Sequence, residues 1–243
     1  MSLMSLKDKC ALITGASSGI GAACARALAG EGARVILTGR NETALKELAE
    51  ATGGEAITAN LRDMAEIERL FTRAGERIDI LINNAGIAPR APIIDGDPDN
   101  FRELLEVNVL ALTRCCQLAL PRFDPVKGGH IINLSSMSGH RVPPSGGFYA
   151  ATKFAVRAVT EALRYELKAG GNRTRVATIS PGFVDTPLLD LYFKGSEDKL
   201  KTLKEEMDML TPADVAAAVL HILQAPAHVE TGDIQLRPSG QGV

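Results

Sequence analysis

The stretch that decides the fold is TGASSGIG, residues 14–21, near the start of the chain. It follows an apolar run at 10–13, which we predict to be a β-strand, and leads into an Ala-rich segment with a helical pattern. Gly15 allows a sharp turn, Gly19 lets the backbone approach a pyrophosphate, and Gly21 lets the helix pack close to the strand. The helix N-terminus adds unpaired N–H groups and the positive end of a dipole. In this strand–turn–helix context the glycines predict a dinucleotide-binding unit.

The rest of the chain alternates short β-branched runs with Ala- and Leu-rich stretches. This pattern is typical of a parallel sheet covered by helices, and continuous apolar runs such as ALIT and VILT suit strands buried on both faces. We expect one α/β domain over residues 6–243, a three-layer doubly wound (Rossmann) fold with a seven-stranded parallel sheet. The expected strands are 10–13, 34–37, 56–59, 80–82, 130–134, 176–179 and 234–236. The expected helices are 21–30, 43–51, 64–77, 99–121, 149–169 and 212–224.

The least regular stretch is 186–211, where LLDLYF precedes the charged sequence GSEDKLKTLKEEMDML. Two interpretations stay open: a movable amphipathic lid over a site, or a helix hairpin on the surface. The apolar side chains there could line a substrate wall, the core or a subunit interface; they are Leu188, Leu189, Leu191, Tyr192 and Phe193.

The bulk composition excludes several classes of protein. A chain of 243 residues that is 45% hydrophobic can bury a sizeable core, and a net charge of −2 argues against a broad surface for nucleic acid or acidic membrane. Residues 1–8 lack the apolar segment of a signal peptide, no apolar run approaches the ~18 residues of a membrane span, and we expect 1–5 to be a flexible leader. The four cysteines show no CxxC pairing, which favours a reducing, cytoplasmic compartment.

The end of the second expected strand, Thr38-Gly39-Arg40, indicates which cofactor is preferred. A site for NAD(H) wants a carboxylate here for the adenosine ribose hydroxyls, whereas Gly39 removes the repulsion that a 2′-phosphate would meet. Arg40 can pair with that phosphate, and Ser17 and Thr38 are possible hydroxyl donors. The pattern predicts NADP(H) over NAD(H), although Arg40 could also be a solvated turn residue.

The sequence YAATK at 149–153 places a phenol and an ammonium one helical turn apart. A phenol ionises near pH 10, and we expect the nearby cation and an oxidised nicotinamide to favour the phenolate, so that Tyr149 serves as general acid and base. Ser136 ends the fifth strand run in the crevice where open α/β sheets bind ligands, and its hydroxyl could donate to a carbonyl oxygen. Such a Tyr–Lys pair alone is often only a surface pair.

Three asparagines at a strand end and in a helix are further candidates for the site. Asn83 and Asn84 come after the fourth expected strand, and Asn108 lies among apolar residues of a helix, where a polar side chain needs partners or a task. A buried capping role is the alternative for each, and for Asn84 it is the better one.

Taken in order, TGxxxGIG, NNAG, a helical Asn, Ser-x12-Tyr-x3-Lys and Pro-Gly after the sixth strand resemble the short-chain dehydrogenase/reductase family over about residues 6–240. By that resemblance the catalytic residues would be Asn108, Ser136, Tyr149 and Lys153, with Asn108 holding a water that links Lys153 to solvent. The implied cofactor contacts are Gly15, Ser17, Ser18, Gly19, Ile20, Arg40, Asn60, Leu61, Asn83, Ala85, Gly86, Tyr149, Lys153, Pro181, Gly182, Val184 and Thr186. Many family members have Asp-Val where this chain has Asn60-Leu61, but an asparagine can still accept from the adenine amine.

The second half is similar to a narrower subgroup of cytosolic carbonyl reductases, on the sequences SMSGHRV, FYAATKFAV, TPADVAAAV and APAHVETGDIQLRPSGQ. That subgroup includes animal enzymes for ketosteroids and α-dicarbonyls and insect farnesol dehydrogenases. The resemblance implies a small carbonyl or secondary-alcohol substrate and a homodimer or homotetramer.

Two other functions stay open. One is a ketoacyl carrier-protein reductase, and the other is a dinucleotide sensor without catalysis, because the fold alone does not fix the function. We expect His140, four residues after Ser136, to be structural, and no spacing among the four histidines suggests a metal site.

Overall fold

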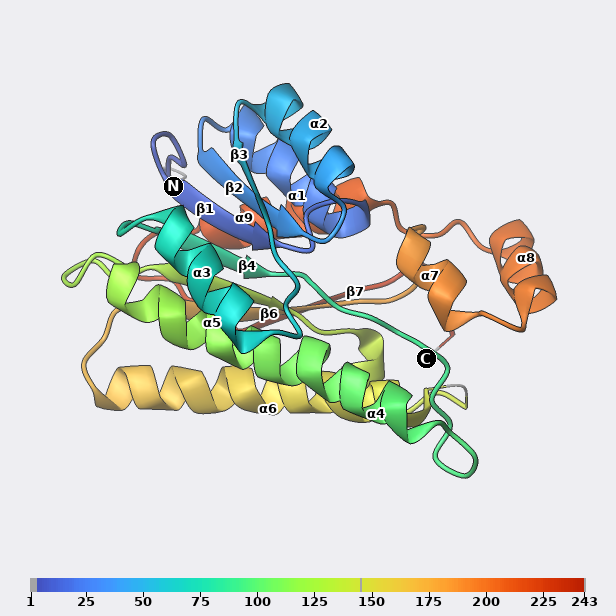
Figure 1. Cartoon of the computed structure of the whole chain (residues 1–243). Helices are drawn as coiled ribbons and strands as arrows, with labels where there is room; N and C mark the ends of the chain where they lie inside the picture. The colour runs from blue at the N-terminus through green and yellow to red at the C-terminus, as the bar shows by residue number, and fades with distance from the viewer. Residues whose placement is uncertain (1–3, 145, 243) are drawn as a thin grey trace.

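The computed structural model describes residues 4–144 and 146–242 of the chain. It confirms the doubly wound α/β fold, with a seven-stranded sheet in the order β3-β2-β1-β4-β5-β6-β7 (Figure 1). Every neighbouring pair of strands is parallel. The strands are β1 (Cys10–Thr14), β2 (Arg34–Gly39), β3 (Glu55–Thr58), β4 (Ile80–Asn83), β5 (His130–Leu134), β6 (Arg175–Pro181) and β7 (Asp233–Leu236). The strand order reverses between β1 and β4, and the carboxyl ends of these two strands form the switch-point crevice.

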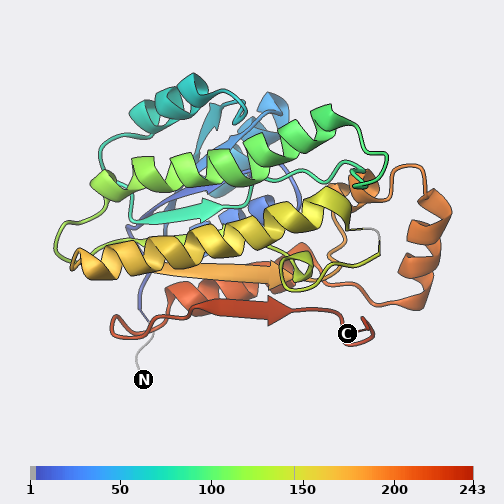
Figure 2. The ribbon, with the colours of Figure 1, turned by 90° about the horizontal axis from the view of Figure 1, so that it is seen from below.

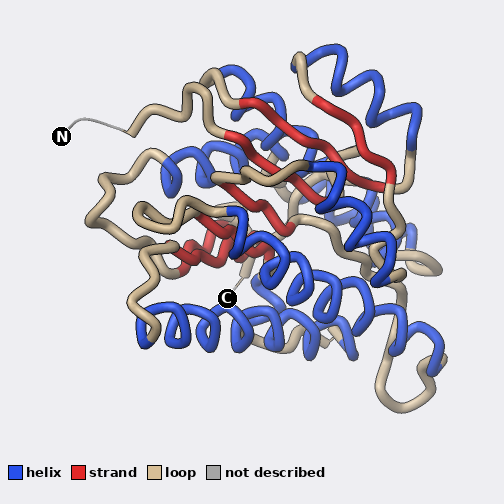
Figure 3. The backbone as a smooth tube through the Cα atoms, turned by 60° about the vertical axis from the view of Figure 1, so that its left-hand side comes forward, coloured by secondary structure: helices blue, strands red, loops and turns tan. Residues whose placement is uncertain are grey.

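Helices cover both faces of the sheet (Figure 3). One layer packs its apolar residues against one face and consists of α1 (Gly19–Gly30), α2 (Glu42–Thr52) and α9 (Pro212–Leu223). The other layer consists of α3 (Met64–Ala74), α4 (Pro98–Leu105), α5 (Leu112–Ala119) and α6 (Gly147–Ala169), of which α3, α5 and α6 bury apolar residues against the opposite face. This is the three-layer arrangement that the alternation of apolar runs predicts.

Strand β1 shows why the apolar runs are continuous. Ala11 and Ile13 pack into the layer of α1 and α9, whereas Cys10 and Leu12 pack into the layer of α3 and α5. Successive side chains of a strand point to opposite faces, so a strand covered on both sides needs apolar residues at every position. Each fully buried leucine or isoleucine stabilises the fold by roughly 1.5–3 kcal/mol.

The helix expected at 99–121 is continuous but not uniform. Between α4 and α5 lies a π-helical stretch, η1 (Glu106–Ala111), and a short 3₁₀ turn, η2 (Leu120–Arg122), follows α5. Among the described residues, Pro98–Arg122 is the one helix long and apolar enough to cross a membrane. Here it runs beside α6 across the sheet (Figure 2) and packs against α3 and α6, as part of the helix layer that contains α3 to α6.

The segment expected as a lid or a hairpin forms two helices, α7 (Pro187–Tyr192) and α8 (Glu197–Glu206). They lie at the end of the molecule toward which the strand arrowheads point (Figure 2). At the start of the chain, residues 1–3 of the expected leader lie outside the described residues. Met4 donates its backbone N–H to the Gln224 carbonyl at 2.9 Å.

Candidate active site

Two adjoining cavities lie at the carboxyl ends of the strands. The first, about 520 Å³, is called the inner cavity below, and the second, about 310 Å³, is called the glycine-turn groove. Ile20, Asn84, Gly86 and Thr186 line both, so the two are continuous. Their position is the ligand crevice that the sheet topology predicts.

The glycine turn is shaped for an anion. Gly15 has a φ of +65°, and a Cβ there would lie 2.8 Å from the Cα of Ala85. A Cβ on Gly21 would collide with the Gly15 carbonyl oxygen. Because glycine has no Cβ, helix α1 can pack close to the turn. The N-cap of α1, Ser18, makes no side-chain hydrogen bond to the first turn of the helix. Its first N–H groups are therefore available to phosphate oxygens, and a dinucleotide pyrophosphate fits this turn.

Most of the expected cofactor contacts line these cavities. In the glycine-turn groove these are Gly15, Ser17, Ser18, Gly19, Ile20, Arg40, Asn60, Leu61, Ala85, Gly86 and Thr186. In the inner cavity they are Ile20, Gly86, Tyr149, Lys153, Pro181, Gly182, Val184 and Thr186. Arg40 is exposed and, among the described residues, has no ion-pair partner. Thr38 is fully buried and does not line the groove, which leaves Ser17 as the hydroxyl beside Arg40.

The structure separates the two asparagines of NNAG. Asn83 lines neither cavity, because its amide donates to Asn133 Oδ1 at 2.9 Å and to Cys116 Sγ at 3.2 Å inside the core. Asn84 has the structural role that the sequence favours: its amide donates to the carbonyls of Thr14 at 2.9 Å and Gly15 at 3.0 Å. It also lines both cavities, whereas the side chain expected to contact the cofactor, Asn83, lines neither.

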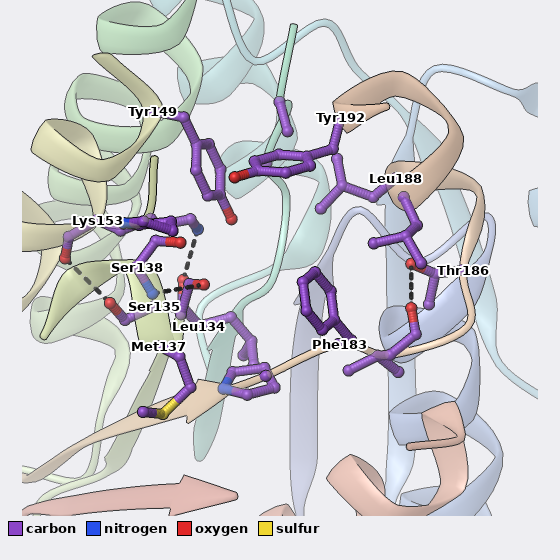
Figure 4. A pocket seen from close by; sticks show the side chains of 18 of the residues that line it. Leu134, Ser135, Met137, Ser138, Tyr149, Lys153, Phe183, Thr186, Leu188 and Tyr192 are labelled. Atoms are coloured by element: carbon purple, nitrogen blue, oxygen red, sulfur yellow. Dashed lines mark hydrogen bonds between the residues drawn. The ribbon is translucent and has the colours of Figure 1, made fainter. Parts of the chain in front are cut away.

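Tyr149, Ser136 and Lys153 meet in the inner cavity. Figure 4 shows Tyr149 and Lys153 on one side of it, with Phe183, Leu188 and Tyr192 across from them. The Lys153 Nζ lies 5.7 Å from the centre of the Tyr149 ring. It donates to the Leu134 carbonyl at 2.9 Å, and burial lowers the pKa of Lys153 to about 8.

Ser136 follows β5 and begins a 3₁₀ turn, η3 (Met137–Gly139). Its Oγ accepts the backbone N–H of Ser138 at 3.1 Å, so its own proton is free to go to another acceptor. A hydrogen bond with Ser136 lowers the pKa of Tyr149. The hydroxyl groups of Ser136 and Tyr149 therefore lie next to each other in the cavity.

The expected phenolate form of Tyr149 depends on an oxidised nicotinamide, and in the protein alone burial opposes it. Burial raises the pKa of Tyr149 well above its ordinary value, and this outweighs the lowering by Ser136. Desolvation dominates because the side chain is buried, and the neighbouring Tyr192 raises the pKa further. The ammonium of Lys153 lies 5.7 Å from the ring centre and donates to the Leu134 carbonyl. Without further positive charge in the cavity, Tyr149 is a proton donor.

Asn108 lies in the π-helical stretch η1 and is buried. Its Oδ1 accepts the Ile87 N–H at 2.9 Å, and its amide donates to the Ile87 carbonyl at 3.0 Å and to Thr152 Oγ1 at 3.1 Å. These bonds join the loop after β4 to helix α6 one residue before Lys153. The side chain positions its neighbours, and the water implied by the family resemblance stays a prediction.

Sequence reasoning missed one wall of the inner cavity. Gln241 and Gly242, near the end of the chain, line it together with Arg141 and Phe183. They reach the site because β7 pairs with β6, and the Phe183 N–H then donates to Gln241 Oε1 at 3.0 Å. Of the five apolar residues in the 186–211 segment, Leu188, Leu189 and Tyr192 line this cavity. Among residues 4–144 and 146–242, no cluster of His, Cys, Asp and Glu could hold a metal ion.

Known proteins share this architecture. Dehydrogenase/reductase SDR family member 11 of Bos taurus is 41% identical over 249 residues, which cover 97% of this chain and 98% of that protein. An oxidoreductase of Staphylococcus saprophyticus is 36% identical over 245 residues, which cover 97% of this chain and all of that protein. The solved structure described as the closed form of serine dehydrogenase complexed with NADP+ has a TM-score of 0.90 and 32% identity and covers 96% of each chain. A serine dehydrogenase from Escherichia coli has a TM-score of 0.81 and 30% identity, covering 96% of this chain and 100% of that one.

A family model described as short chain dehydrogenase matches residues 9–197, which include the glycine turn, Ser136, Tyr149 and Lys153. The match therefore spans β1 to β6, the glycine-turn groove and the inner cavity apart from Met207, Gln241 and Gly242. The chain belongs to the short-chain dehydrogenase/reductase family of oxidoreductases.

Proposed function

We propose that this protein transfers hydride between NADP(H) and a carbonyl or secondary-alcohol substrate, with Tyr149 as general acid and base. The observation that supports this most is the meeting of Tyr149, Ser136 and Lys153 in a cavity continuous with the glycine-turn groove. A dinucleotide laid along the groove would bring its nicotinamide end beside these three residues.

In the proposed mechanism the bound nicotinamide supplies or accepts the hydride. Ser136 donates its hydroxyl proton in a hydrogen bond to the substrate oxygen, which stabilises the developing alkoxide. Tyr149, protonated because it is buried, gives its proton to that oxygen during reduction. In the oxidation direction Tyr149 would act as a phenolate that takes the proton of the alcohol hydroxyl, with the ammonium of Lys153 nearby to stabilise it.

The preference for NADP(H) is supported by Arg40, which lines the groove beside Ser17, and by the NADP+ complex of the structural relative. Gly39 leaves room at this point, since a Cβ there would come within 3.3 Å of Ser17 Oγ. No acidic side chain lines the groove within the described part of the chain.

Arg40→Ala should raise the KM for NADPH about 10- to 100-fold, because a charge-assisted hydrogen bond contributes on the order of 1.5–3 kcal/mol. The KM for NADH should change little. Steady-state kinetics with both cofactors measure this, and Arg26→Ala, an exposed arginine on α1, is the control. Equal losses for both cofactors would contradict the assignment of Arg40 to the 2′-phosphate.

The substrate class follows from the wall of the inner cavity. Phe183, Leu188, Leu189 and Tyr192 favour an apolar or mid-sized carbonyl compound, in keeping with the resemblance to ketosteroid, dicarbonyl and farnesol enzymes. The relative named serine dehydrogenase makes a small hydroxy amino acid the second class to test. We propose that α7 and α8 form a lid over this cavity, because Leu188, Leu189 and Tyr192 of α7 line it and Met207 lines it directly after α8.

The assembly and location are proposals too. Three large apolar side chains are exposed on α4, η1 and α6, namely Leu105, Leu110 and Phe154. They would suit a homodimer or homotetramer interface. All four cysteines are buried and unpaired, which favours the cytoplasm.

NADPH oxidation with a panel of ketones, α-dicarbonyls, steroids, hydroxy-acid precursors and acyl thioesters distinguishes the competing functions. We expect turnover of small or apolar carbonyls. Turnover confined to acyl carrier thioesters would support the ketoacyl reductase, and tight NADPH binding without turnover of any carbonyl would support the sensor.

A further inference from the structure

The turn that presents Ser136 is held from several sides. Gly139 donates its N–H to the Ser136 carbonyl at 2.8 Å, and its own carbonyl accepts from Arg157 of α6 at 2.9 Å. A Cβ on Gly139 would lie 2.6 Å from Ser135 Oγ, so the turn packs directly on the chain before it. The position of the Ser136 hydroxyl therefore depends on what anchors residues 137–141.

His140 is the anchor at the far end of this turn. Its Nε2 lies 2.9 Å from Ser180 Oγ on β6 and 3.4 Å from Asp233 Oδ2 on β7. Ser180 Oγ also donates to Asp233 Oδ1 at 3.3 Å, and Arg157 Nε lies 3.7 Å from Asp233. We call His140, Arg157, Ser180 and Asp233 the His140 cluster. Because Ser180 gives its proton to the carboxylate, it accepts the Nε2–H of His140.

The cluster has the residue types of a hydrolytic triad but not its accessibility. Ser180 has no exposed surface, and neither Ser180 nor Asp233 lines a described cavity. No substrate can reach that hydroxyl. The four residues instead join the Ser136 turn to α6, β6 and β7.

The next residue makes a second bond to the same region. Arg141 Nη2 donates to the Gly242 carbonyl at 2.6 Å, in the segment that follows β7 and forms a wall of the inner cavity. Consecutive residues of the turn thus bind β7 through Asp233 and the chain after β7 through Gly242.

We propose that His140 is a positioning residue for the reaction: through Ser180 and Asp233 it holds the Ser136 turn in register with Tyr149. This inference rests on the proposed function, since it assigns His140 to the same acid–base site. It goes beyond the structural role that the sequence suggests, because it makes catalysis depend on a side chain that does not touch the substrate.

The consequence is a dependence of Tyr149 on His140. The hydrogen bond from Ser136 lowers the pKa of Tyr149, while burial and Tyr192 raise it and Lys153 lies beside the ring. If the turn loosens and Ser136 withdraws, the pKa of Tyr149 rises further. His140 itself stays neutral in the range of interest, because burial and Arg157 lower its pKa against the opposing effect of Asp233.

The test compares His140→Ala, His140→Gln, Ser136→Ala and the double variant His140→Ala/Ser136→Ala. For alcohol oxidation, the rise of kcat with pH should move upward by about 0.5–1 unit in His140→Ala. The kcat should fall roughly 10- to 100-fold with the KM for NADP+ unchanged. Glutamine can donate from nearly the position of Nε2 and should restore both quantities. The double variant should show no shift beyond that of Ser136→Ala, and His221→Ala on the surface of α9 is the control.

A readout without turnover keeps this inference separate from the proposed function. With 13Cζ-labelled tyrosine, the Tyr149 resonance in His140→Ala should move toward its position in Ser136→Ala, while His140→Gln keeps the wild-type position. A His140→Ala protein with an unchanged Tyr149 resonance and pH profile would overturn the inference even if the wild type is active. A wild type that reduces no carbonyl would overturn the proposed function, while the resonance comparison would still decide whether His140 places Ser136 beside Tyr149.

Discussion

Tyr149→Phe should lower kcat about 1,000-fold or more and leave NADPH binding unchanged. The substitution removes only the hydroxyl that exchanges a proton with the substrate, and general acid–base catalysis by one positioned group contributes about 10²- to 10⁴-fold. The ring, which packs edge-on against Tyr192 at 5.8 Å between centroids, stays in place. Steady-state kinetics measure the fall in kcat, and titration of NADPH fluorescence measures the binding.

Tyr165→Phe is the matched control, because Tyr165 lies on the same helix and is 69% exposed. It should retain full activity. A Tyr149→Phe enzyme within about 10-fold of the wild type would mean that another group transfers the proton, and would contradict the mechanism.

Lys153→Met should abolish turnover and stabilise the protein at the same time. Lys153 is only 5% exposed, and burial lowers its pKa from 10.5 to about 8. The folded state therefore holds this ammonium at a cost on the order of 3 kcal/mol at neutral pH. Methionine has a similar length and no charge, so the free energy of unfolding at pH 7 should rise by about 1–3 kcal/mol, partly offset by the lost bond to Leu134. Activity falls because Tyr149 loses its neighbouring cation.

The pH dependence of stability gives this prediction its sign. Between about pH 8 and 10.5 the unfolded chain binds the Lys153 proton and the folded chain does not, so the free energy of unfolding should rise with pH in this window. Below pH 8 the full cost remains. Denaturant unfolding from pH 7 to 9.5 should show a steeper rise for the wild type than for Lys153→Met, with the exposed Lys201→Met as control. A variant less stable than the wild type at pH 7 would contradict the burial cost assigned to Lys153.

The fold was predictable because its evidence is local and repeated. Each strand is a short apolar run between helical segments, and β5 has the bounds expected from HIINL. The ends of the other elements moved by a few residues, as caps and frayed turns are not encoded in periodicity. The π-helical stretch η1 could not be predicted, because it comes with the tertiary bonds of Asn108 to Ile87 and Thr152.

Some residues of the candidate site were predictable from the sequence and others were not. Ser136, Tyr149 and Lys153 were predictable from spacing, because a strand end and one helical turn bring them together. The burial of Asn83 in the core was not, since one residue along a strand decides between core and cavity. Gln241 and Gly242 became visible only once β7 paired with β6. The raised pKa of Tyr149 depends on burial, which the YAATK spacing does not contain.

The most direct test of hydride transfer in this cavity is to follow the hydrogen itself. The best carbonyl substrate of the panel is reduced with NADPH that carries deuterium at both C4 positions, and the alcohol is analysed by mass spectrometry. The mechanism predicts one deuterium on the former carbonyl carbon with the wild type and essentially no alcohol with Tyr149→Phe. An alcohol whose carbon hydrogen comes from the solvent, or NADPH oxidation without labelled product, would contradict it.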